Sequence, residues 1–179
     1  MMNGKLLERA MAILAKRDHS EVELRRKLAA PPTFKRYQKR RCYDENNDAT
    51  EVSVSMQSSS PTYEISPQEI EAVIEYCQQH HWLDDKRFAE NLLKSRSRKG
   101  YGPRRIQMEL QQKGVESSVI DYVLAESEIN WLELASDEIN KKFGKQDLAD
   151  WKIKSKAYNY LSYKGYYSEK INEALNKRN

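Results

Sequence analysis

The chain has 179 residues, of which 39% are hydrophobic and 32% are charged, and its formal net charge is +4. This composition is too polar for one deep core, and six glycines are few for a turn-rich β fold. The sequence contains no run of about 18 apolar residues, which a membrane-spanning helix would need. Charges interrupt the apolar positions near the N-terminus, where a signal peptide needs an unbroken run. We therefore expect a cytoplasmic, monomeric, surface-rich helical protein in which Cys42 and Cys77 are free thiols.

The first predicted elements are two short helices. Apolar residues repeat at helical spacing over 5–14. Ser20 and Glu23 then match a capping box, in which each side chain satisfies a free backbone N–H beside the other. Leu24 and Leu28 follow one turn apart, so this second helix has one apolar face.

The segment 31–63 differs in composition from the rest of the chain. It joins a basic cluster within 35–41 to a stretch rich in Ser, Asn and Asp. Such a composition buries too little apolar area to offset the entropy of ordering. We interpret the segment as a flexible insert, and the alternation at 52–54 leaves a short strand as the alternative.

Regular structure is expected to resume at Ser66. Pro67 stands at the first helical position and Glu69 at the third, which together with a capping Ser mark a helix start. Apolar residues then repeat at helical spacing over 70–77. We therefore predict a third helix in this part of the chain.

The most clearly marked stretch, 82–115, predicts two helices joined by a glycine-containing turn. Asp84 or Asp85 can cap the first helix, because a carboxylate accepts from free backbone N–H groups and suits the positive end of the helix dipole. Pro103 suits the first position of the second helix. Gly114 ends it, because glycine tolerates left-handed backbone.

Four further helices are predicted towards the C-terminus. They lie around 120–124, over 131–143, over 151–161, and in a last segment that Ser168 would cap. Among the aromatic residues we expect core positions for the three tryptophans and two tyrosines, because core packing is the commonest use of large aromatic side chains. These residues are Trp82, Trp131, Trp151, Tyr163 and Tyr166.

The spacing of apolar residues and glycine repeats along the chain. Successive separations of 4, 4, 6 and 4 residues occur twice. The two series are Ile106, Leu110, Gly114, Ile120 and Leu124, and Ala157, Leu161, Gly165, Ile171 and Leu175. The first part of the chain has a matching series interrupted by 32 additional residues, namely Leu24, Leu28, Ile70 and Ile74.

This repetition predicts an all-α fold of three tandem three-helix, helix-turn-helix-like repeats in an elongated array. Three small helices bury little area alone, so neighbouring repeats should stack. We place the repeats at 1–83, with the insert inside it, at 84–127 and at 128–179. Coincidence in a leucine-patterned helical protein is the alternative interpretation.

A dense basic turn within 94–105 is the candidate functional feature. It has six cations and no acidic residue, so we expect mutual repulsion rather than the paired charges of an ordinary helix surface. Tyr101 lies among the cations, and aromatics beside cations suit stacking or interface anchoring. A solvated helix end is the simpler alternative.

No enzymatic chemistry is indicated. The Gly100-Tyr101-Gly102 turn lacks the GK[ST] ending of a phosphate loop, and Pro103 removes a backbone N–H that would contact phosphate. Cys77 with His80 and His81 gives a weak zinc pattern, because a structural site needs four ligands. We therefore expect no metal and no cofactor.

Three motifs resemble the RecX family of bacterial regulators of the RecA recombinase. They are Arg17-x-x-Ser20-x-x-Glu23-Leu24 with Lys27-Leu28, Trp82-Leu83-Asp84-Asp85-x-x-Phe88-Ala89, and Arg96-x-x-x-Gly100-x-Gly102-Pro103-x-x-Ile106-x-x-Glu109-Leu110-x-x-Lys113-Gly114. The resemblance covers nearly the whole chain except the insert, and the first repeat departs from it by lacking the Lys-Gly stop. It implies three tandem three-helix repeats that dock along the RecA–DNA filament and inhibit ATP hydrolysis, strand exchange and co-protease activity.

From the resemblance and the charge pattern we expect a non-enzymatic regulator of RecA in DNA repair, recombination and the SOS response. The alternatives are a direct DNA-binding protein of tandem Myb-like or helix-turn-helix units and, less favoured, a nucleic-acid-processing enzyme. RecA filaments are the expected partner, with single- or double-stranded DNA as a further candidate. The candidate contact residues are Arg26, Lys27, Lys94, Arg96, Arg98, Lys99, Tyr101, Arg104, Arg105, Lys152, Lys154 and Lys156.

Overall fold

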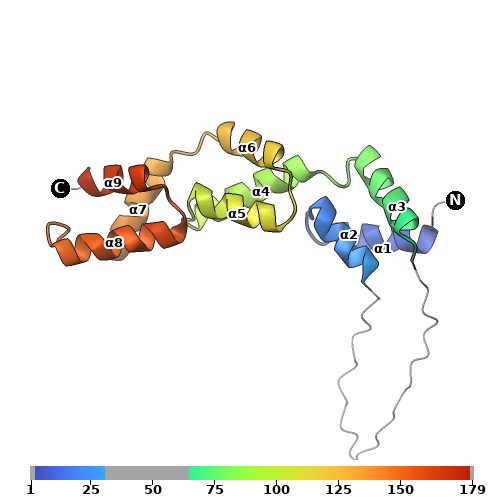
Figure 1. Cartoon of the computed structure of the whole chain (residues 1–179), viewed down its shortest axis with the longest axis horizontal. Helices are drawn as coiled ribbons and strands as arrows, with labels where there is room; N and C mark the ends of the chain where they lie inside the picture. The colour runs from blue at the N-terminus through green and yellow to red at the C-terminus, as the bar shows by residue number, and fades with distance from the viewer. Residues whose placement is uncertain (1–2, 31–64, 178–179) are drawn as a thin grey trace, which may run out of the picture.

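The computed structural model describes residues 3–30 and 65–177. Within these ranges all regular structure is α-helical, and the helices follow one another as a long row (Figure 1). The helices are α1 Gly4–Leu14, α2 Glu21–Ala29, α3 Pro67–Gln79, α4 Asp85–Arg98, α5 Pro103–Gln112, α6 Ser117–Ala125, α7 Trp131–Phe143, α8 Trp151–Lys164 and α9 Ser168–Asn176. The predicted insert at 31–63, the alternative strand at 52–54 and Cys42 lie outside the described residues.

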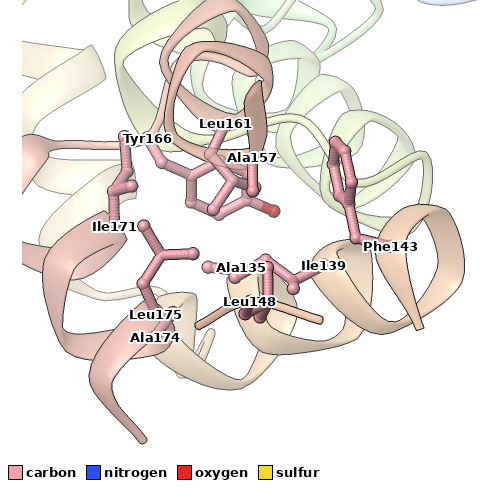
Figure 2. Packing of buried hydrophobic residues seen from close by; sticks show 10 residues of the cluster. All are labelled: Ala135, Ile139, Phe143, Leu148, Ala157, Leu161, Tyr166, Ile171, Ala174 and Leu175. Carbon is pink, nitrogen blue, oxygen red and sulfur yellow. The ribbon is translucent and has the colours of Figure 1, made fainter. Parts of the chain in front are cut away.

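The helices group by threes around separate apolar cores, which we call unit 1 (α1–α3), unit 2 (α4–α6) and unit 3 (α7–α9). Leu24, Ile106 and Ala157, which the repeat aligns, are fully buried in their respective units. In unit 3 the side chains of all three helices converge on one small core (Figure 2). The all-α helical-repeat fold is thereby confirmed.

The helix starts follow the local sequence. Ser66 and Glu69 form the predicted capping box, and the Asp84 side chain accepts from the backbone N–H of Arg87. Ser168 is not a cap, contrary to prediction: it is the first helical residue of α9, and Tyr167 precedes it without a side-chain hydrogen bond. None of the helices in the described ranges is long and apolar enough to cross a membrane.

The aromatic predictions are only partly confirmed. Tyr166 is 2% exposed and belongs to the unit 3 core, whereas Trp151 is 76% exposed and Tyr163 is 74% exposed. The core-facing positions of α8 include Ala157 and Leu161. Trp151 lies six residues before Ala157, and Tyr163 lies two residues after Leu161. At about 100° per residue these steps turn both side chains about 200–240° from the core-facing side of the helix, so both rings point to solvent.

Trp82 and Trp131 also depart from the expected burial in different degrees. Trp131 is half-buried and packs against the cores of units 2 and 3. Trp82 is an exposed residue that packs edge-on against Tyr76 and tilted against His80 at the end of α3. Cys77 is a free thiol inside the unit 1 core, where burial raises its pKa.

The second helices of the units, α2, α5 and α8, follow one another along one side of the row (Figure 1). Two contacts join these helices. In each, the start of one of them meets the turn that follows the next one along the row. We call the contact between the start of α2 and the turn after α5 the first joint. The second joint is the contact between the start of α5 and the turn after α8.

Side chains make the first joint. The hydroxyl of Ser20 donates to the carbonyl of Lys113 at 2.5 Å. The Lys113 ammonium in turn donates to Glu23 Oε1 at 2.8 Å, and Arg17 binds both oxygens of the same carboxylate at 3.0 Å. The Asp85 carboxylate, which does not cap its own helix, accepts from a backbone N–H at the start of α2, that of Glu21. Unit 1 and unit 2 are therefore held together mainly by charged side chains.

Candidate interaction surface at the second joint

The predicted basic turn connects α4 to α5 and lies at the second joint. Lys99 is the C-cap of α4, and Gly100 has a φ of +74°, a left-handed conformation that glycine adopts without strain. Gly102 precedes Pro103, the first residue of α5, and no side chain caps this helix start. The free N–H groups of α5 must therefore find their acceptors elsewhere.

The end of α8 supplies these acceptors. The backbone N–H of Gly102 donates to the carbonyl of Lys164 at 2.9 Å, and that of Arg104 donates to the carbonyl of Gly165 at 3.0 Å. A helix start and a helix end thus satisfy each other, and their dipoles align head to tail. A Cβ at Gly102 would lie 2.5 Å from the carbonyl of Gly165. The glycine at 102 permits this close approach of two backbones.

Glu138 of α7 lies buried beneath the turn. Its carboxylate accepts from Lys164 Nζ at 2.9 Å, from the Tyr160 hydroxyl at 3.0 Å and from Lys141 Nζ at 3.2 Å. Burial alone would raise the pKa of Glu138, but these three hydrogen bonds outweigh it and hold the pKa below its usual value. The carboxylate is therefore ionised at neutral pH.

The cations of the turn are not all free, which corrects the expectation of general mutual repulsion. Arg96 binds the two carboxylate oxygens of Glu109 with its Nε and one terminal nitrogen, at 2.7 and 2.5 Å. The hydrogen bond from Arg96 lowers the pKa of Glu109. The acid lies in α5, outside the basic stretch, so proximity along the chain could not reveal the pair. Arg96 has a structural partner and is the weakest of the turn's candidate contact residues.

Arg105 is held between two aromatic rings. Its guanidinium carbon lies 4.8 Å from the ring centre of Tyr101 and 5.1 Å from that of Tyr163. One of its nitrogens also donates to the carbonyl of Tyr163 at 3.3 Å. The ammonium of Lys164 also lies over the Tyr101 ring, 5.0 Å from its centre. Such cation–π contacts fix a cation in place without neutralising its charge.

The second joint therefore brings the cations of the α4–α5 turn next to aromatic and basic side chains from the end of α8. We call this surface the joint face, and its members are Arg98, Lys99, Tyr101, Arg104, Arg105, Tyr163 and Lys164. Arg98, Lys99 and Arg104 are exposed. A hollow of about 540 Å³ opens on the α4–α5 side, and it is lined by Arg96, Lys99, Tyr101, Arg105, Met108, Glu109, Gln112 and Lys113.

The remaining candidates lie apart from the joint face. Arg26 and Lys27 belong to α2, and Lys27 Nζ lies 2.7 Å from Nε2 of the buried His19. Lys94 is exposed on α4, within the helix rather than at its end. The lysines of α8, Lys152, Lys154 and Lys156, lie in its first half, away from its end at Lys164. The structure thus spaces these cations along the row instead of gathering them.

Sequence reasoning missed the contribution of unit 3 to this surface. Glu138, Tyr163 and Lys164 were not among the candidates, although Lys164 precedes Gly165 as Lys113 precedes Gly114. That repeated Lys-Gly pair was the available signal, because each lysine binds a buried carboxylate across or beside a joint. The joint face offers fixed cations and aromatic rings, and its neighbouring carboxylates are held in ion pairs. Chemically, this arrangement suits binding of an anionic partner.

The fold and this surface place the protein in the helical-repeat class, in which stacked small units present one extended surface. Two family models match it: the second three-helix domain of RecX at residues 84–124 and the third at residues 128–175. Among similar proteins, the regulatory protein RecX of Serratia proteamaculans is 47% identical over 168 residues, which is 93% of each chain. The namesake from Yersinia enterocolitica is 44% identical over 172 residues, which is 96% of each chain.

Solved structures agree in fold. A crystal structure of RecX from Lactobacillus salivarius has a TM-score of 0.68 at 14% identity, covering 97% of this chain and 94% of that one. A second structure, of regulatory protein RecX, has a TM-score of 0.64 at 18% identity, covering 97% of this chain and 70% of the other. The chain belongs to the RecX family of regulatory proteins.

Proposed function

We propose that this protein is a non-enzymatic regulator that binds filaments of RecA on DNA and inhibits their ATP hydrolysis, strand exchange and co-protease activity. Membership in a family of regulatory proteins supports a regulatory role. In the proposed mechanism the row of units lies along the filament and bridges neighbouring protomers. It thereby restrains the motions that accompany nucleotide turnover, or promotes protomer release.

The observation that carries this proposal is the fixed basic geometry of the joint face. Arg105 is held between two rings, and Arg98, Lys99 and Arg104 are exposed residues at or beside the same turn. Because Arg105 is already held in place, it loses little side-chain entropy when an anionic surface binds. The field of the four cations would also speed the encounter with an acidic or DNA-containing target.

The other candidate cations would extend this contact along the row. Arg26 and Lys27 would do so from unit 1, Lys94 from α4, and Lys152, Lys154 and Lys156 from unit 3. We further propose that the units correspond to the repeats 1–83, 84–127 and 128–179, with 31–63 as an insert in the first.

The test is whether the purified protein, at substoichiometric amounts, slows DNA-dependent ATP hydrolysis by RecA. Replacing Arg98, Lys99, Arg104 and Arg105 together by Ala should abolish the inhibition and leave the circular dichroism spectrum unchanged. A matched control removes four exposed lysines outside the joint face, Lys5, Lys16, Lys145 and Lys177. Full inhibition by the joint-face variant, with normal helicity, would contradict the proposal.

Direct binding to single-stranded DNA is the second candidate function, favoured by the exposed Tyr163 ring beside Arg105. In that case affinity for naked DNA should fall with salt at a log–log slope of roughly 0.7 per phosphate contacted. The quadruple variant should flatten the slope. If RecA surface is the main target, naked DNA should bind weakly at all salt concentrations and only filament binding should respond to the substitutions.

A further inference from the structure

A buried carboxylate in unit 3 lies directly against the basic turn of unit 2. Glu138 is 6% exposed. A Cβ placed on Gly100 would overlap its carboxylate group. The turn therefore packs on Glu138 so closely that only a glycine fits at this position, and the left-handed φ of +74° imposes the same requirement.

Lys164 connects this carboxylate to the end of α4. Its ammonium donates to Glu138 Oε2 at 2.9 Å and to the carbonyl of Lys99 at 3.0 Å. The side chain of Lys164 is 16% exposed, so the ion pair is largely shielded from water. Burial lowers the pKa of Lys164, but the hydrogen bond to Glu138 and the charge of that carboxylate raise it by more. The pKa of Lys164 is therefore above its usual value. The ammonium therefore stays charged and retains both bonds.

A second tie runs from unit 3 to the same turn. The hydroxyl of the buried Tyr166 donates to the carbonyl of Gly100 at 3.2 Å. The carbonyls of Lys99 and Gly100 are thus both fixed by side chains of unit 3. The last carbonyls of a helix have no hydrogen-bond donor within the helix. Lys164 and Tyr166 therefore supply donors that α4 itself lacks.

The tie at Lys164 extends to the functional cations. Lys164 lies over the ring of Tyr101, and that ring is one of the two that hold Arg105. Tyr163, the other ring, precedes Lys164 in α8. The position of the Arg105 guanidinium therefore depends on how the end of α8 sits on Glu138.

We propose that Glu138 is a positioning residue of the joint face. Through Lys164 it fixes the turn and Arg105 in the arrangement that the anionic partner recognises, so the face is complete only when units 2 and 3 are joined. The inference rests on the proposed function of the joint face. It adds that a buried acidic residue, which itself cannot touch the partner, sets the affinity of a basic surface.

Glu138→Gln tests this by removing the charge and keeping the shape. The control is Glu133→Gln, which makes the same change at an exposed position of the same helix. Affinity for RecA filaments on single-stranded DNA is measured at a temperature where circular dichroism shows each variant to be folded. We expect Glu138→Gln to weaken binding about tenfold, whereas Glu133→Gln should bind normally. A tenfold loss corresponds to the entropy cost of ordering one or two long side chains when the partner binds.

The salt dependence separates positioning from loss of contacts. Glu138→Gln should weaken binding equally at each salt concentration, because the contacting cations remain, whereas the quadruple joint-face variant should reduce the slope. Glu138→Asp keeps the charge and should recover part of the affinity. Lys164→Met removes the same tie from the other side and serves if Glu138→Gln does not fold.

Normal affinity of folded Glu138→Gln, or of folded Lys164→Met if the first variant does not fold, would overturn the positioning role. If the quadruple variant loses binding in the same experiment, the proposed function survives that result. If the quadruple variant also binds normally, the joint face itself is not the contact surface.

Discussion

The two joints occupy equivalent places in the repeat but differ in chemistry. At the first, side chains dominate: Ser20 binds the carbonyl of Lys113, and Lys113 binds Glu23. At the second, backbone meets backbone, with the N–H groups of Gly102 and Arg104 on the last carbonyls of α8. The same architecture therefore joins its units once through adaptable ion pairs and once through a close, rigid contact.

This difference shows where the molecule can tolerate change. Side chains at the first joint can rearrange around a substitution, because long charged groups have alternative rotamers. Two backbones in contact cannot separate locally without moving the helices that carry them. The joint face, which we propose as the binding surface, lies at the rigid joint, and a rigid contact suits cations that must stay in place.

The largest expected effect is from Gly165→Ala, at the rigid joint. Gly165 has a φ of +90°, and its added Cβ would lie 2.6 Å from the backbone nitrogen of Arg105. We expect the free energy of unfolding to fall by roughly 2–5 kcal/mol, from left-handed strain plus overpacking. Urea denaturation followed by circular dichroism measures the loss.

The matched substitution at the first joint is Gly114→Ala. Gly114 has a similar φ of +79°, but its Cβ would meet the side chain of Val22 rather than backbone. We expect a smaller loss, about 1–3 kcal/mol, part of which Val22→Gly should recover in a double-mutant cycle. Arg105→Gly should give no such recovery for Gly165→Ala, and equal recovery in both cycles would contradict the comparison.

Glu23→Gln is expected to weaken the first joint by roughly 1–3 kcal/mol at pH 7, because Arg17 and Lys113 lose a charged acceptor. Hydrogen bonds from Arg17 and then Lys113 overcome the effect of burial and lower the pKa of Glu23 from 4.5 to about 2. The depressed pKa gives stability that is present above pH 4.5 and is lost as the pH falls towards 2. The wild-type advantage in urea midpoint should therefore shrink over that interval, and a constant difference down to pH 2 would contradict the assignment.

Two serine caps separate the energy of a joint from that of a helix cap. Ser66 only caps α3, whereas Ser20 caps α2 and also donates to Lys113 across the first joint. Ser66→Ala should cost about 1 kcal/mol and Ser20→Ala about 2 kcal/mol. The difference between the two thermal or urea measurements gives the contribution of the joint hydrogen bond, and equal losses would show that this bond adds nothing.

The smallest effect is expected at the far end of α2, where none of the units in the described ranges continues the row. The Arg9 guanidinium donates there to the carbonyls of Lys27, Leu28 and Ala30. Arg9→Ala should cost about 1 kcal/mol. Arg26→Ala, at an exposed position of α2, should stay within about 0.5 kcal/mol of wild type in the same urea titration.

Local sequence patterns were sufficient to predict the helices and their repetition. Apolar residues at helical spacing, capping residues and glycine stops act within a few residues of one another, so their meaning does not depend on the rest of the fold. The capping box at Ser66 and the burial of Leu110 and Leu161 followed from such local patterns. The basic turn was also visible, because its cations are close together in the chain.

The partners of the cations, and the side chains around them, depend on how the units pack and could not be predicted from local patterns. Arg96 meets an acid from the next helix, and the turn meets Glu138, Tyr163 and Lys164 from another unit. These contacts join residues from 13 to 65 positions apart, where local spacing carries no information. The sequence shows glycines at 100 and 102 but not their cause, which is the close approach of unit 3 to the turn.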